Sequence, residues 1–143
     1  MKAWPTGWRI HSRSHPQLAP LFELVDGATD FDAQWPVRLR ACLEELLADL
    51  GRHYEAEEEG ELYSSIPRAH PQFRQPLLDL VSEHDEIRAT LDSILGSCEE
   101  AVGDPARCEA LALRASLLAA RVRRHEASED VILLSAALLE VAP

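Results

Sequence analysis

The chain is poor in basic residues, and this shortage limits its partners. It has 14 lysines and arginines against 25 aspartates and glutamates, which gives a formal net charge of −11 at pH 7. Such a chain repels the phosphate backbone of nucleic acids. The composition therefore argues against a nucleic-acid partner and favours cations as ligands.

Long hydrophobic runs are also missing. No apolar segment reaches the roughly 20 residues that a membrane-spanning helix needs. The N-terminal segment MKAWPTGWRIHSRS lacks the continuous apolar stretch of a signal peptide. We therefore expect no contact with a membrane and a cytoplasmic protein.

The three cysteines, Cys42, Cys98 and Cys108, form no CxxC pair and are odd in number. This pattern is typical of small buried or half-buried side chains in a reducing compartment. A redox role for Cys98 and Cys108, which flank a predicted turn, is the alternative.

The motifs of several enzyme classes are absent. The sequence contains no G-x-S-x-G, no P-loop and no dinucleotide fingerprint. The segment HEASED begins like the zinc-protease motif HExxH, but Glu129 stands where the second histidine is required. No catalytic residue is indicated, and whether the protein is an enzyme stays open.

Strand-like alternation of polar and apolar residues is absent too, whereas helical periodicity is present throughout. Residues 25–32 and 102–107 read as loops, the latter with Asp104 as N-cap and Pro105 at the first helical position. Residues 64–76 carry three prolines and cannot form one continuous helix. The remaining stretches are predicted helices over 16–26, 35–63, 76–98 and 105–141. Short connections between them favour an all-α fold, an antiparallel four-helix bundle.

Each predicted helix has an apolar stripe of helical period. The stripes consist of Leu18, Phe22 and Val25; of Leu39, Leu43, Leu46 and Leu50; of Leu77, Leu80, Val81, Ile87, Leu91 and Ile94; and of Leu111, Ala115, Leu118, Val122, Ile132 and Leu139. We expect these faces to form the core.

Histidines continue or interrupt all four stripes, namely His15, His53, His84 and His125. Glu57 and Glu129 follow two of them by four residues, which places each pair on one helix face. A buried carboxylate is costly unless it is paired or binds a metal. Imidazole and carboxylate together suit iron, manganese or zinc. The stripes therefore predict a metal centre.

Other readings of these residues remain open. A histidine on an apolar face is commonly a core residue with a satisfied hydrogen bond, and a single His-x3-Glu pair is commonly a surface pair. Glu58 borders the inner face of its helix and is ambiguous. His11 and His70 match no stripe, so they are not expected to contribute to the site.

On these residues the chain resembles the hemerythrin-like, or HHE cation-binding, family. The matching segments are SHPQLAPLFEL, HYEAEEEGELY, EHDEIRATL and RHEASEDVILL, one per predicted helix, over roughly residues 11–134. The resemblance implies a single domain over 1–143, with 1–13 as an N-terminal extension. It also implies an up-down-up-down bundle that holds two irons, bridged by oxygen and by two carboxylates.

Carried over to this sequence, the resemblance makes six residues metal ligands: His15, His53, Glu57, His84, His125 and Glu129. Glu57 and Glu129 are the implied bridges, and zinc or manganese are the lesser alternatives to iron. Oxygen-carrying members have a second histidine on the third helix, where this chain has Leu80. A donor is therefore missing, and water, a substrate or another carboxylate such as Glu58 would take that position. Pro16 disfavours helical geometry at His15, which makes His11 the fallback ligand.

The resemblance implies a protein that binds a small ligand such as O2, peroxide or nitric oxide. Sensing of oxygen or redox state, iron handling, and protection against oxidative or nitrosative stress all fit that chemistry. The alternatives are an iron enzyme acting on peroxide or nitric oxide, and a metal-free or zinc-bound helical interaction module.

Overall fold

Helices make up almost all of the structure, a computed structural model that describes residue 16 and residues 18–141. In chain order the elements are α1 (Leu18–Val25), α2 (Trp35–Glu59), α3 (Glu61–Ala69), the 3-10 turn η1 (Pro71–Phe73), α4 (Arg74–Ser97), the 3-10 turn η2 (Glu99–Ala101) and α5 (Pro105–Val141). The described residues contain no β-strand, so the expected all-α class is confirmed for this part of the chain.

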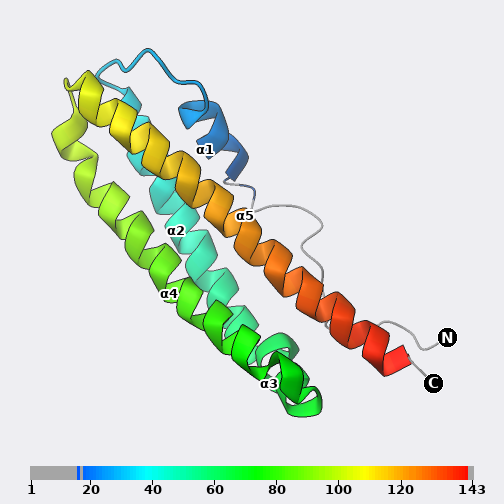
Figure 1. The fold of residues 1–143 in the computed structure, drawn as a ribbon. Helices are drawn as coiled ribbons and strands as arrows, with labels where there is room; N and C mark the ends of the chain where they lie inside the picture. Colours follow the sequence, from blue (N-terminus) through cyan, green and yellow to red (C-terminus); the bar gives the residue numbers. More distant parts are fainter. Residues whose placement is uncertain (1–15, 17, 142–143) are drawn as a thin grey trace.

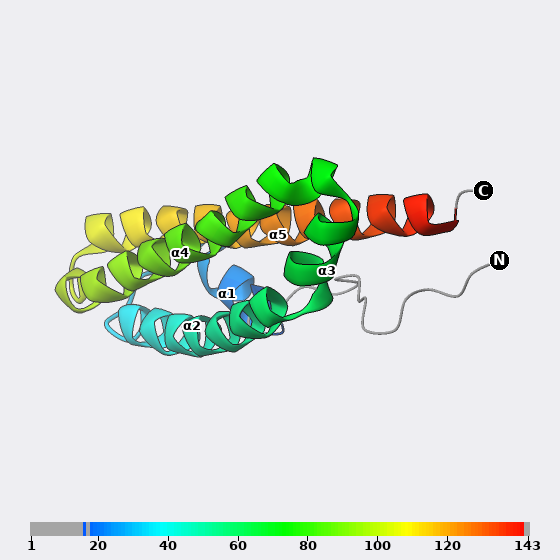
Figure 2. The ribbon, with the colours of Figure 1, turned by 90° about the horizontal axis from the view of Figure 1, so that it is seen from below.

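Four helices pack around one another as a bundle. Helix α4 contacts α5 and α2, and the short α1 contacts both α5 and α2, which closes the ring. Figure 1 shows α1 beside α2 and α5 near one end of the bundle. Figure 2 shows α3 at the other end, between the end of α2 and the start of α4. Helix α1 therefore lines only one part of the bundle's length.

The turn before α5 follows the sequence prediction. Asp104 Oδ1 accepts a hydrogen bond from the backbone N–H of Arg107 at 3.2 Å, and Pro105 is the first helical residue. Gly103 just before it has φ of +77°, a backbone conformation that only glycine adopts without strain. These residues set the point where the chain reverses from α4 into α5.

The prediction of one helix over 35–63 is wrong at its end. Helix α2 stops at Glu59, and Gly60 has an extended backbone, with φ of −86° and ψ of −179°. A Cβ at Gly60 would lie 3.2 Å from the carbonyl oxygen of Ala56, a tight contact that the backbone would have to adjust to accommodate. The chain then turns into a separate helix, α3.

Most of the segment 64–76 is helical, although not as one helix. Helix α3 includes Pro67, which lacks the N–H that would bond the carbonyl of Tyr63. The helix ends at Ala69, and Arg74 Nε donates to the carbonyl oxygen of Pro67 at 3.1 Å. The prolines therefore divide the segment, as predicted, without removing its helical structure.

Two separate groups of apolar side chains fill the bundle. The larger group, here called the first core, contains the leucines of α1 and α2 together with Ile87, Leu91, Leu118 and Val122. The smaller group, the second core, consists of Leu62, Ile66, Leu77, Ile132, Leu133 and Ala136, with Leu80 packed against it. Most residues of the predicted stripes thus face inward. Val81 is half-buried and belongs to neither core, and Leu139 is exposed because the last turns of α5 extend past α4 (Figure 2).

Trp35 fixes the connection between α1 and α2. Its indole Nε1 donates to the carbonyl oxygen of Leu24 at 2.9 Å, and its ring meets Phe31 edge-on at 4.7 Å. Cys98 and Cys108 are buried, Cys42 is half-buried, and the described residues form no disulfide. In the part of the chain that the structure describes, no helix combines the length and the apolar character needed to cross a bilayer.

Candidate metal centre

A layer of polar side chains separates the first core from the second. His84 on α4 and His125, Glu126 and Glu129 on α5 are the buried polar residues of the described chain. The periodic stripes on these helices explain the position, because each histidine stands where an apolar residue would otherwise continue the core. The bundle therefore encloses imidazoles and carboxylates between two dry regions.

Four side chains of this layer converge on one point. Glu57 from α2, His84 from α4, and His125 and Glu129 from α5 each offer a ligand atom, and these atoms all lie within 4.8 Å of one another. His125 Nε2 is 3.3 Å from Glu129 Oε1, and His84 Nε2 is 3.9 Å from Glu129 Oε2. Two imidazoles and two carboxylates at this separation form a donor set that suits a transition metal.

The outer nitrogens of both histidines are held by carboxylates. His125 Nδ1 donates to Glu83 Oε1 at 2.8 Å, and His84 Nδ1 donates to Glu58 Oε1 at 3.2 Å. Arg121 Nε lies 3.6 Å from the other oxygen of Glu83 and so helps to orient it. Metal-binding histidines typically donate their second ring N–H to a carboxylate in this way, which fixes the tautomer and turns Nε2 toward the metal.

Several inward-facing atoms have no hydrogen-bond partner. Within the described residues, His84 Nε2, His125 Nε2 and Glu129 Oε1 are buried and make no hydrogen bond. Buried polar atoms are costly when they are left in this state. A metal ion bound by these atoms would remove that cost, so the residues fit the group that the donor set implies.

Two tyrosines enclose His84. The ring of Tyr54 stacks on it with a centroid separation of 3.9 Å and an interplanar angle of 9°, and the ring of Tyr63 meets it at 5.6 Å. Tyr63 Oη donates to Glu129 Oε2 at 2.5 Å. The Tyr54 hydroxyl, in contrast, is buried without a hydrogen-bond partner in the described chain. Tyr63 therefore positions a candidate ligand, and Tyr54 shields the site.

Burial and neighbouring charges shift the pKa values of Glu129 and His125 in opposite directions. Burial alone would raise the pKa of the Glu129 carboxyl, but contacts with His125 and His84 outweigh it and hold that pKa below its usual range. Burial opposes protonation of His125, yet Glu129 and Glu83 raise its pKa overall. Burial and the nearby carboxylates raise the pKa of both tyrosines, so their hydroxyls stay protonated. The site is thus a concentration of negative charge that attracts a cation.

The structure brings together four of the six predicted ligands. His53 lies one turn before Glu57 and contacts its Oε1, but it is half-buried and stands outside the group of four. His15 and the fallback His11 lie outside the described residues. His70 is remote and contacts Glu140 at 3.0 Å, as expected for a histidine off the stripes.

Leu80 is partly buried against the second core, so it offers no donor to the centre. The Glu58 side chain is 35% exposed and holds His84 at Nδ1, the ring nitrogen away from Glu129, which argues against it as the replacement ligand.

Four residues of the site were not predicted from the sequence. Glu83 and Tyr63 contact residues on other helices, and no periodicity in their own helix reveals that. Tyr54 follows Leu50 by four residues on the same stripe, so its burial could have been read from the pattern. Glu126 follows His125 in the chain and is buried, although it is not a member of the apolar stripe predicted for this helix.

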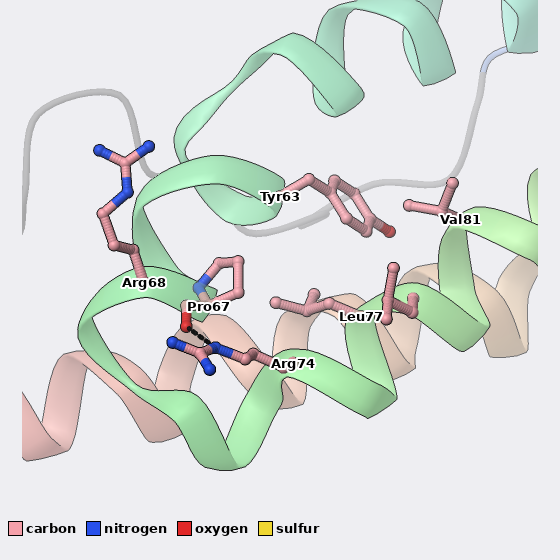
Figure 3. A pocket seen from close by; sticks show the side chains of 7 residues that line it. Tyr63, Pro67, Arg68, Arg74, Leu77 and Val81 are labelled. Carbon is pink, nitrogen blue, oxygen red and sulfur yellow. Dashed lines mark hydrogen bonds between the residues drawn. The ribbon is translucent and has the colours of Figure 1, made fainter.

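A pocket opens next to the site between α3 and α4. It has a volume of about 350 Å³ and is lined by Tyr63, Pro67, Arg68, Arg74, Leu77, Leu78 and Val81. Figure 3 shows the Tyr63 ring reaching from α3 toward Val81 and Leu77 on α4. Since the hydroxyl of the same tyrosine bonds Glu129, this one side chain separates the pocket from the candidate centre.

The hydroxyls of the two tyrosines allow a matched test of the site. In the metal-free protein, Tyr63→Phe is expected to lower the free energy of unfolding by about 2 kcal/mol, because a hydrogen bond to a charged, buried carboxylate is lost. Tyr54→Phe removes a hydroxyl without a partner and is expected to be neutral or stabilising. Urea unfolding of both variants measures the difference. Equal effects of the two substitutions would contradict the contact with Glu129.

Comparison with protein-family models finds one match, to the hemerythrin HHE cation-binding domain, over residues 7–137. Neither the curated proteins nor the solved structures gave a significant match. The match covers all four residues that converge in the structure. The resemblance read from the sequence is thereby confirmed.

Proposed function

Because the chain belongs to the hemerythrin HHE cation-binding domain family, we propose that its polar layer holds non-haem iron. The observation that carries this proposal is the pair of buried imidazoles, His84 and His125. Each is held at Nδ1 by a carboxylate and turns a buried, unbonded Nε2 toward Glu129. This arrangement places a proton on Nδ1 and directs Nε2 into the layer, where it can bind a metal in its unprotonated form.

We propose two irons, with Glu57 and Glu129 as the carboxylates between them. The group of four supplies one set of donors, and His53, in contact with Glu57, supplies the start of a second. His15 is proposed as the ligand from the N-terminal part of the chain. An up-down-up-down course of the bundle helices α1, α2, α4 and α5 is part of the same proposal. The short turn between α4 and α5 supports it.

Iron is favoured over a structural zinc by the number and kind of donors. A structural zinc site is usually closed by four ligands, commonly cysteines and histidines. Here the proposed set of six contains no cysteine, and the three cysteines of the chain are not among the residues that converge. Mixed imidazole and carboxylate ligation suits iron and manganese as well as zinc, so metal analysis decides among them.

The proposed role is reversible interaction with a small ligand such as O2, peroxide or nitric oxide, in sensing, iron handling or protection from oxidative or nitrosative stress. Iron held here would bind the small ligand and change its oxidation state. The chain's own residues prepare the environment. Tyr54 and Tyr63 cover His84 and exclude bulk water, while Glu83, held by Arg121, keeps a proton on His125 Nδ1.

Enzymatic turnover of peroxide or nitric oxide is the second candidate. The pocket between α3 and α4 favours it, because a small molecule in that pocket would contact the side chain that bonds Glu129. Arg68 and Arg74 line the same pocket and would attract an anion. Turnover of peroxide by the iron-loaded protein that stops in a variant with the pocket filled, such as Val81→Trp, would favour the enzyme.

Metal content is the experiment that tests the proposal. We expect about two iron atoms per chain after anaerobic reconstitution, because six donors on four helices exceed what one structural zinc needs. The measurement is elemental analysis together with an optical spectrum. Protein that stays metal-free after reconstitution would refute the proposal, and one tightly held zinc would favour the interaction module.

A further inference from the structure

Helix α5 carries a second apolar stripe, on the side opposite the bundle. Its large members are between 42% and 69% exposed, and they are Leu113, Leu117, Val131, Leu134, Leu138 and Val141. Ala120, Arg124 and Ala127 fill the positions between them and are exposed as well. A continuous apolar surface of this length is unusual in a protein that does not bind a partner.

The spacing of this outer stripe identifies the shape of the partner. Steps of three and four residues alternate without a break from Leu113 to Val141, over about four heptads. A strict period of 3.5 residues is the pattern of a helix that packs along another helix in a left-handed supercoil. Helices that face only their own core need no such regularity.

Among the residues that the structure describes, none of the other helices covers the outer stripe. On one flank, Arg114 donates to Ser93 at 2.8 Å and Arg121 pairs with Glu86, both on α4. On the other flank, the guanidinium of Arg123 lies over the ring of Phe22 on α1, 4.2 Å from its centroid. The stripe runs between these two contacts, facing away from α4 and α1.

We propose that the outer stripe is a homodimer interface, in which α5 packs antiparallel against α5 of a second copy of this chain. The sequence of the stripe is self-complementary when it is reversed. One register sets Leu117 opposite Leu134, Leu113 opposite Leu138, and Ala120 opposite Val131. These six residues therefore face one another in pairs of matching or complementary size, as a two-fold interface requires.

The one charged member of the stripe selects this orientation. A parallel pair would bring Arg124 of one copy against Arg124 of the other, which is unfavourable. The antiparallel register sets Arg124 opposite Ala127, whose small side chain leaves room for the guanidinium to reach water. The same register brings Arg123 near Asp130 of the second copy, which adds an attraction between opposite charges.

Sedimentation velocity of the full, metal-loaded chain tests the dimer. We expect dimers at about 100 µM and dissociation on dilution, as for an interface of moderate affinity. Leu117→Lys and Leu134→Glu, each made alone, are expected to weaken the dimer by at least about tenfold. Leu78→Glu alters a residue of α4 that is 60% exposed and outside the stripe, so this control should remain dimeric.

Mixing the two single variants tests the register. In an antiparallel pair, Lys at position 117 of one copy meets Glu at position 134 of the other, so the mixture should form heterodimers. A parallel pair would not bring these positions together. A wild-type chain that stays monomeric at about 100 µM, or a mixture that stays monomeric, would overturn the proposal. Binding of the monomer to phosphatidylcholine vesicles would assign the stripe to a membrane surface instead.

Discussion

His125→Ala is expected to abolish metal binding. The variant removes one of the two buried imidazoles and also leaves Glu129 without its neighbour at 3.3 Å. Loss of a direct ligand should lower the affinity for iron by more than the 10- to 100-fold typical of losing an outer-shell partner. Titration with ferrous iron under anaerobic conditions, followed by elemental analysis, measures the change.

Further variants test whether the loss of iron binding is specific to this site. Glu83→Gln keeps the shape of the side chain that holds His125 but weakens the contact, so a 10- to 100-fold loss of affinity is expected. Glu44→Gln is its control, since Glu44 pairs with Arg40 and contacts neither the histidine nor Arg121. His70→Ala controls for loss of a histidine away from the site. If His125→Ala retains full iron content, the candidate centre is wrong.

Removal of the metal is expected to lower the melting temperature by roughly 10 °C. A ligand that binds only the folded state at a thousand times its Kd adds about 4 kcal/mol of stability. For a chain of this size, each kcal/mol corresponds to several degrees. The buried atoms of His84, His125 and Glu129 that make no hydrogen bond are one source of this stabilisation, because a bound metal would give them a partner.

Calorimetry of the loaded and the chelated protein measures this shift. His125→Ala should melt at the same temperature with and without iron, which separates linkage at the site from unspecific binding to the acidic surface. A wild-type melting temperature that does not respond to chelation would show that the polar layer gains nothing from a metal.

Much of the fold and part of the centre follow from periodicity alone. Leu39, Leu43, Leu46 and Leu50 repeat on one face of α2 and are buried. On α5, His125 and Glu129 continue such a buried face into the polar layer. A regular helix fixes these directions, so a sequence is sufficient to predict them.

The remaining features depend on how helices meet. Glu83 is next to His84 in the chain, yet it bonds His125 on another helix. Tyr63 reaches Glu129 only because the chain bends at Gly60 and starts a new helix. The bend itself depends on the close approach of Gly60 to the carbonyl of Ala56, a contact that no pattern in the sequence records.

The division of the interior into two cores has a consequence for how the molecule opens. The second core has only six buried residues, and the layer between it and the first core is polar. Without an ion in that layer, α3 and the adjoining ends of α4 and α5 have little to couple them to the rest, so their amides should exchange with solvent through local opening. An ion bound by residues of α2, α4 and α5 would join both regions into one cooperative unit. The metal would then determine where the protein first loses its structure, and proteolysis would begin at the α3 end of the chelated form.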